Sequence, residues 1–145
     1  MYVKQISVYL ENCKGTLRAM TKTLANNGID LLALSIADTA SFGIVRLVVK
    51  EEQIEQTVTC MKAEGFMVRT DDVVCVAVPN QPAGLDQVLE ILDGADISIE
   101  YIYSFNFSLT DAALLILRLN DNQKATEVLA KGNIRLYNQE DIDKL

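Results

Sequence analysis

Two short segments hold the residues best suited to bind a ligand. Residues 12–17 read Asn-Cys-Lys-Gly-Thr-Leu, and residues 80–85 read Asn-Gln-Pro-Ala-Gly-Leu, 68 positions later. Each segment precedes an amphipathic stretch and therefore predicts a helix N-terminus, where unpaired N–H groups and a partial positive charge favour a carboxylate. Gly15 and the pair Ala83-Gly84 let a ligand approach the backbone. The amides of Asn12 and Asn80 both donate and accept hydrogen bonds.

A ligand with an ammonium group also needs an acceptor. Asp30 lies 15 residues after Gly15, at the predicted start of a strand, and Ser98 lies 15 residues after Ala83. Asp30 opens a stretch that is apolar on both faces, where an unpaired carboxylate is costly, so it is expected to have a partner, either a bound ammonium or a lysine. A carboxylate binder, an ammonium acceptor and apolar walls together describe a site for a free α-amino acid.

The elements that position these residues form a repeat. Apolar alternation and helical spacing predict strand, helix, strand, strand, helix, strand. In the first copy these cover residues 3–10, 16–24, 29–37, 44–49, 51–63 and 66–69, and in the second residues 73–78, 85–92, 97–107, 112–119, 123–131 and 134–137. Asp71-Asp72 is expected to be a tight polar junction, and residues 138–145 a solvated tail with at most one helical turn. Thr16 is expected to cap the first helix.

The predicted fold is therefore α+β, with two ferredoxin-like βαββαβ units at residues 1–70 and 71–145. The helices are expected on one face of each sheet, and the units are expected to pack side by side because each is small for a stable core. A homodimer is expected for the same reason, and because the other face of such a sheet is open.

Composition excludes several chemistries. The 145-residue chain has no histidine and three cysteines, so Ser-His and Cys-His nucleophilic pairs and a four-cysteine zinc site are impossible. No catalytic residue, metal or cofactor is expected. The net charge of −7 argues against nucleic acid. No apolar run is long enough to span a membrane. No signal peptide is visible, and the odd cysteine count fits reduced thiols, so a cytoplasmic location is expected.

Residues 11–17 and 80–85, placed in this order of elements, resemble the ACT domain, a small regulatory module that binds amino acids. The resemblance covers the whole chain as two tandem copies, although Lys14 stands where proline is usual and Ala83 where glycine is usual. It implies a free-standing sensor, without catalysis, whose ligand lies where the turn of one unit meets the second strand of its neighbour. The ligand-binding residues it implies are Asn12, Gly15, Thr16, Leu17, Asp30, Leu31, Asn80, Ala83, Gly84, Leu85 and Ser98. The regulated enzyme is unknown.

A second hypothesis needs no ligand. The asparagines are equally explained as turn formers, since asparagine satisfies its own backbone locally. Tyr101, Tyr103, Phe105 and Phe107 alternate and predict one aromatic strand face, which we interpret as a packing face, with a pocket wall or a dimer surface as alternatives. The chain would then be a homodimeric protein-interaction scaffold with empty turns.

Overall fold

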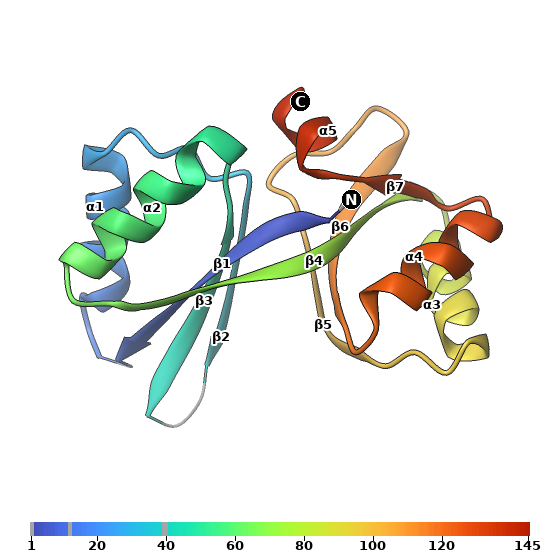
Figure 1. The fold of residues 1–145 in the computed structure, drawn as a ribbon, viewed down its shortest axis with the longest axis horizontal. Helices are drawn as coiled ribbons and strands as arrows, with labels where there is room; N and C mark the ends of the chain where they lie inside the picture. Colours follow the sequence, from blue (N-terminus) through green and yellow to red (C-terminus); the bar gives the residue numbers. More distant parts are fainter. Residues whose placement is uncertain (1, 12, 39–40) are drawn as a thin grey trace. The chain divides into compact units, whose positions relative to one another are not determined.

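The computed structural model describes residues 2–11, 13–38 and 41–145, and the chain folds as two compact units. The N-terminal unit is Lys4–Asp71, and the C-terminal unit combines Tyr2 and Val3 with residues 72–145. Each unit contains a β-sheet and a pair of longer helices, and the C-terminal unit adds a short third helix (Figure 1). Among the described residues, no helix is long and apolar enough to cross a membrane.

The N-terminal unit places its strands in the order β2-β3-β1-β4. Its elements are β1 (Val3–Glu11), α1 (Thr16–Asn26), β2 (Ala33–Asp38), β3 (Phe42–Val48), α2 (Glu51–Ala63) and the first part of β4 (Met67–Pro79). The β3 strand is antiparallel to both β1 and β2, with Leu47 opposite Ile6 on one side and Leu34 on the other. The buried faces of α1 and α2 contribute Met20, Leu24 and Met61 to the core.

The C-terminal unit repeats this arrangement in the order β5-β6-β4-β7. It uses the second part of β4, then α3 (Gly84–Gly94), β5 (Ile99–Ser104), β6 (Ala112–Leu119), α4 (Asn122–Lys131), β7 (Arg135–Tyr137) and α5 (Gln139–Asp143). Its core packs Val88 of α3 and Leu129 of α4 together with strand residues that include Val76 and Leu117.

Backbone hydrogen bonds recur at the 68-residue spacing. Ala19 N donates to Gly15 O at 3.0 Å and Gln87 N to Ala83 O at 3.1 Å, at the start of each unit's first helix. Ile29 N donates to Leu24 O at the end of α1, as Ile97 N does to Leu92 O at the end of α3, both at 3.0 Å. The predicted tandem of ferredoxin-like units is confirmed.

Several predicted element boundaries differ from the observed ones, and three of the differences change the interpretation. Asp71 and Asp72 do not break the chain but lie within the continuous strand β4, where Asp72 O accepts from Arg118 Nη1 and Asn122 Nδ2. The second strand starts at Ala33 instead of 29, because the Asp30 N–H is used by Gln53 Oε1 and not by a neighbouring strand. The β5 strand stops at Ser104 instead of 107.

The C-terminal tail contains a helical turn that one buried side chain anchors. Asn138 accepts from Asp141 N at 2.9 Å while its own N–H donates to the Asp141 carboxylate at 3.0 Å, a reciprocal cap that starts α5. The Ile142 side chain is fully buried. The predicted helical turn is confirmed. The predicted solvation is correct for Glu140, Lys144 and Leu145, which are exposed, and wrong for Ile142.

Candidate functional site

The turn between β1 and α1 presents a helix N-terminus beside open space. Gly15 is the N-cap residue, with φ of +91°, a conformation that side chains with a Cβ rarely adopt. A Cβ at this position would have no neighbour within 4 Å among the described atoms. The predicted cap by Thr16 is wrong: the Thr16 hydroxyl donates to Cys13 O at 3.1 Å and lies 2.9 Å from Cys13 Sγ.

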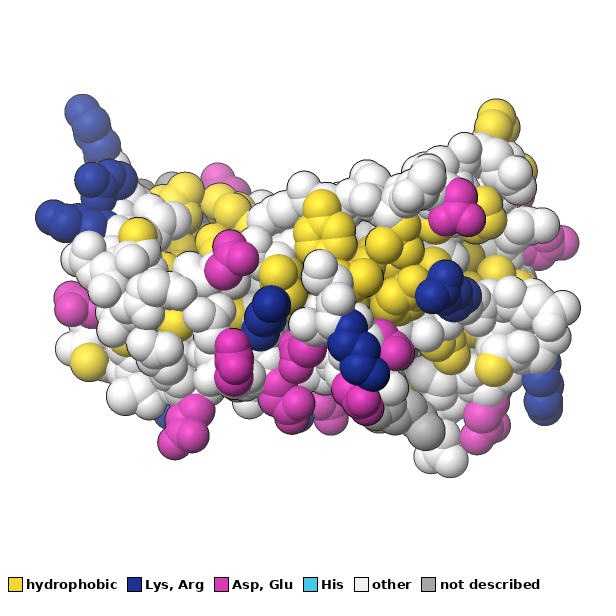
Figure 2. Space-filling model, turned by 90° about the horizontal axis from the view of Figure 1, so that it is seen from above, with side chains coloured by type: hydrophobic (Ala, Val, Ile, Leu, Met, Phe, Trp, Pro, Cys, Tyr) yellow, Lys and Arg dark blue, Asp and Glu magenta, His cyan; other side chains and the backbone are white. Residues whose placement is uncertain are grey.

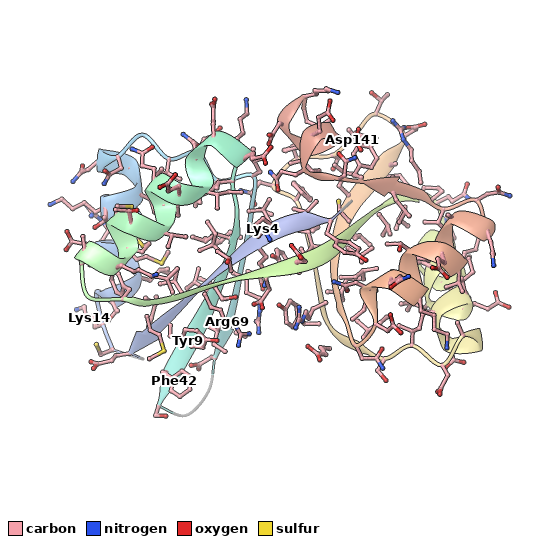
Figure 3. All side chains as sticks on the ribbon, viewed as in Figure 1. Lys4, Tyr9, Lys14, Phe42, Arg69 and Asp141 are labelled. Carbon is pink, nitrogen blue, oxygen red and sulfur yellow. The ribbon has the colours of Figure 1, made fainter. Side chains whose placement is uncertain are left out.

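The charges around this turn favour an anion. No side chain caps α1 among the described residues, and the first turn of the helix has no acidic residue. Lys14 precedes the helix and Arg18 lies in its first turn, both exposed, and Figure 3 places Lys14 at this end of α1. Leu17 is 39% exposed and offers an apolar contact next to them. The predicted ligand residue Asn12 lies outside the described residues.

The turn between β4 and α3 has the same backbone course and a different surface. Ala83 is the N-cap residue with φ of +68°, although it is not a glycine. Gly84 is buried, and a Cβ on it would clash with the Pro79 carbonyl oxygen. Asp86 places a carboxylate in the first turn of α3. Gly84 is thus required for packing against β4, and the acid disfavours a second carboxylate at this helix end.

A shallow hollow of about 480 Å³ lies beside this second turn. Its lining includes the predicted residues Asn80 and Leu85, together with Ala113 and Leu115 of β6. Ala83 and Gly84 are not part of the lining. The structure therefore brings two of the predicted residues to one concave surface and leaves the other two in the backbone of the turn.

Asp30 and Leu31 do not join the turn of their own unit. They follow the C-terminus of α1, whereas Gly15 is at its N-terminus, and eleven helical residues at 1.5 Å each separate the two by about 16 Å. Asp30 is exposed, so the expected cost of burying its carboxylate does not arise. Asp30 and the turn of its own unit are therefore apart, because α1 carries the chain from one end of the sheet to the other.

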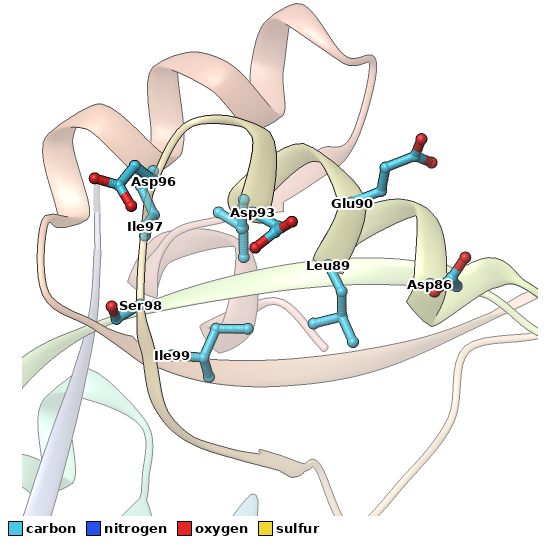
Figure 4. A pocket seen from close by; sticks show the side chains of 9 residues that line it. Asp86, Leu89, Glu90, Asp93, Asp96, Ile97, Ser98 and Ile99 are labelled. Atoms are coloured by element: carbon cyan, nitrogen blue, oxygen red, sulfur yellow. The ribbon is translucent and has the colours of Figure 1, made fainter.

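Ser98 is likewise separated from Ala83 by the length of α3. Its N–H donates to Asn120 Oδ1 at 3.0 Å, and it lines a groove of about 660 Å³ along α3 (Figure 4). The other walls include the carboxylates of Asp86, Glu90, Asp93 and Asp96. This acidic surface was not predicted from the sequence, although the excess of acids after residue 70 was a usable signal.

The aromatic row on and after β5 packs in pairs. The Tyr101 and Tyr103 rings stack with centroids 6.3 Å apart, and Phe105 meets Phe107 edge-on at 5.7 Å. Phe105 is 6% exposed, while the other three rings are half-buried. This geometry agrees with the packing face favoured from the sequence.

Comparison with known proteins identifies the family. The family model described as an ACT domain pair matches residues 1–145. The chain belongs to the ACT domain pair family. The protein BT0572 from Bacteroides thetaiotaomicron is 36% identical, with 100% of this chain and 98% of that chain covered and a TM-score of 0.89. A search of curated proteins found no match.

More distant structures share the fold of this ACT pair. The regulatory subunit of aspartate kinase from Thermus thermophilus is 15% identical, with 91% of each chain covered and a TM-score of 0.68. Aspartokinase alpha and beta subunits are 17% identical, with 90% and 91% covered and a TM-score of 0.62. The predicted family is confirmed, and ACT domains are regulatory modules that bind amino acids.

Proposed function

We propose that this ACT pair is a non-catalytic regulatory protein that binds a free amino acid through the carboxylate at the β1–α1 turn. The observation that carries the proposal is the uncapped N-terminus of α1, with open space at Gly15 and cations at Lys14 and Arg18. The donors and charges there complement a carboxylate.

Asp30 stays the proposed acceptor for the ligand's ammonium group. Because α1 separates it from Gly15, it is proposed to serve a turn other than that of its own unit. The β4–α3 turn is the weaker binder in this proposal, since Asp86 repels a carboxylate there. Reduced thiols support the cytoplasmic location: Cys13, Cys60 and Cys75 are all free.

The test is a thermal-shift screen of the twenty amino acids on the full chain, followed by calorimetry on each hit. At least one amino acid should raise the melting temperature. Arg18→Glu should abolish the shift, and the matched change Lys124→Glu on α4 should leave it intact, because Lys124 is exposed and remote in sequence from either turn. Asp30→Ala should also abolish binding without unfolding the protein.

Two results would contradict the proposal. If no amino acid shifts the folded protein at millimolar concentration, the sensor function is wrong and the ligand-free scaffold is supported. If binding survives Arg18→Glu but is lost on changing Asn80 or Leu85, the amino acid occupies the hollow at the second turn instead.

A further inference from the structure

The C-terminal unit contains a further hollow of about 600 Å³, the β7 hollow, beside the first residue of β7. Its walls come from α3, from the adjoining ends of β4 and β6, and from the turn between α4 and β7. The apolar side chains of its lining are Ala77, Pro79, Ile91, Ala112 and Ile134. A volume of roughly 300–1,000 Å³ is typical of small-molecule sites. The described residues of the lining include none of the β4–α3 turn at 80–85, so this is a separate place.

The hollow includes two positions at which the N-terminal unit carries aromatic rings. At the 68-residue spacing, Ala77 of β4 is equivalent to Tyr9 of β1. Ala112 and Phe42 are the first residues of the equivalent strands β6 and β3, and each lies opposite the residue two positions after Ala77 or Tyr9. The Tyr9 and Phe42 ring centroids are 6.5 Å apart (Figure 3). The C-terminal unit thus has two methyl groups where the N-terminal unit has a pair of rings.

An aromatic ring would supply the contacts that the two alanines do not make. Aromatic rings bury a large apolar area, and apolar cavities lined by residues such as Leu and Ile bind ring compounds. Ile91 of α3 stands where the N-terminal unit has Thr23, so this wall is more apolar than its counterpart. Ile134 adds apolar surface just before β7. The lining therefore favours a ring over a purely polar ligand.

Two carboxylates border this apolar surface. Glu90 on α3 and Asp111 just before β6 belong to different walls, and both residues are exposed. Within the part of the chain that the structure describes, neither takes part in a salt bridge. The N-terminal unit has Lys22 at the position of Glu90, and Lys and Arg side chains gather at one end of that unit (Figure 2). The acids are particular to the C-terminal unit and suit a cation.

Arg135 is the only cationic side chain among the described residues of the lining, and it has a partner in its own strand. Its guanidinium carbon lies 4.8 Å from the centroid of the Tyr137 ring, a cation–π contact. Tyr137 is 6% exposed, so the ring is fixed in the core. The hollow therefore offers two carboxylates against one guanidinium that already contacts a ring.

We propose that the β7 hollow is a second ligand site, which binds a small aromatic amine. The ring lies against Ala77 and Ala112, and the carboxylates of Glu90 and Asp111 hold the ammonium group. Burial of the ring supplies most of the affinity, since exposed charge pairs are individually weak, and the acids select a cation over an anion.

The test titrates phenethylamine into the isotope-labelled full chain and follows the backbone amide shifts by NMR. Saturable shifts are expected at residues 77, 112 and 134, with a Kd of about 1 mM or tighter for a compound of this size. Hydrocinnamate has the ring and a carboxylate in place of the ammonium group, and butylamine has the ammonium group without the ring. Each should bind at least about tenfold more weakly.

Variants locate the site. The double variant E90Q/D111N should lose at least about tenfold in affinity for phenethylamine. The matched control D93N/E127Q removes two charges at exposed positions of α3 and α4 outside the lining, and should bind like the wild type. Ala112→Phe places in the hollow the ring that the N-terminal unit carries at this position, and should block binding. Melting curves check that each variant is folded.

Four results would overturn the proposal. These are no saturable shifts in the wild type, equal losses in the two double variants, binding of hydrocinnamate as tight as that of phenethylamine, or shifts confined to the β1–α1 turn. Arg18→Glu should leave phenethylamine binding unchanged, because Arg18 belongs to the proposed amino-acid site. Failure here therefore leaves that site standing, and failure of the amino-acid screen leaves the β7 hollow standing.

Discussion

The β1–α1 and β4–α3 turns have one backbone course and opposite surfaces. In both, a residue with positive φ starts the helix, and the same backbone hydrogen bonds close the turn. At the first turn that residue is Gly15 beside open space, whereas the second turn uses Ala83 and buries Gly84 against β4. The comparison shows that the fold sets the direction of the N–H groups at the helix N-terminus, while a few side chains determine whether an anion is favoured there.

The largest expected difference lies at the position after the N-cap residue. Gly84→Ala forces a Cβ into the Pro79 carbonyl oxygen and should lower the free energy of unfolding by about 2–3 kcal/mol, since backbone cannot yield as a side chain can. Thr16→Ala at the equivalent position removes only an exposed hydroxyl hydrogen bond and should cost about 0.5–1 kcal/mol. Urea denaturation of both variants checks this, and equal costs would show that the two turns pack alike.

The second difference is the pH dependence of stability at one buried strand position, which is Cys75 in the C-terminal unit and Ser7 in the N-terminal unit. Burial, with a smaller contribution from Asp141, raises the pKa of the Cys75 thiol from 9.0 to about 12, whereas the equivalent buried residue of the N-terminal unit is Ser7. The unfolded thiol ionises first as pH rises above 9, so the stability due to Cys75 is fully present below pH 9 and is lost towards pH 12.

Between pH 8 and pH 10 the unfolding free energy of the wild type should therefore fall by about 1.4 kcal/mol more than that of Cys75→Ala. Urea titrations at several pH values measure the difference. Ser7→Ala keeps Cys75, so it serves as the matched control and should follow the pH profile of the wild type. Parallel pH profiles for wild type and Cys75→Ala would contradict the prediction.

The third difference is the strain at the N-cap residues. Gly15→Ala places a Cβ on a residue with φ of +91° and should destabilise the protein by about 1–2 kcal/mol. Ala83→Gly relieves the same kind of strain in the folded state, which stabilises the protein. Glycine also increases the backbone entropy of the unfolded state, which offsets part of this gain, so the net stabilisation should be about 0.5 kcal/mol. Melting curves of the two variants should shift in opposite directions; shifts of one sign would mean that the turns differ in backbone and not only in side chains.

The smallest expected effects come from the charges in the first helical turn. Arg18→Gln should stabilise α1 and Asp86→Asn should destabilise α3, each by about 0.3–1 kcal/mol, because the helix dipole favours acids at this end. Both effects should vanish at about 0.5 M salt. A stabilising Arg18→Gln would show that Arg18 serves binding rather than folding, and a destabilising one would remove that argument.

Local patterns predicted most of the fold. The helix over 51–63 agrees residue for residue with α2, because its apolar spacing and the glycine at position 65 after its C-terminus are properties of neighbours in sequence. The break at Asp71-Asp72 was wrong because Arg118 and Asn122, almost fifty residues away, hold the Asp72 carbonyl in an extended strand. The tail is not solvated throughout, because tertiary packing buries Ile142.

The sequence by itself determined the repeat and its two glycine-containing turns, since both depend on residue type and short-range spacing. Only the tertiary structure decided which of the candidate residues meet. It put Asp30 at the far end of α1 from Gly15, enclosed Gly84 against β4, and left Arg18 of α1 and Asp86 of α3 exposed. The reason is that contact depends on where helices and strands carry the chain, which spacing along the sequence does not specify.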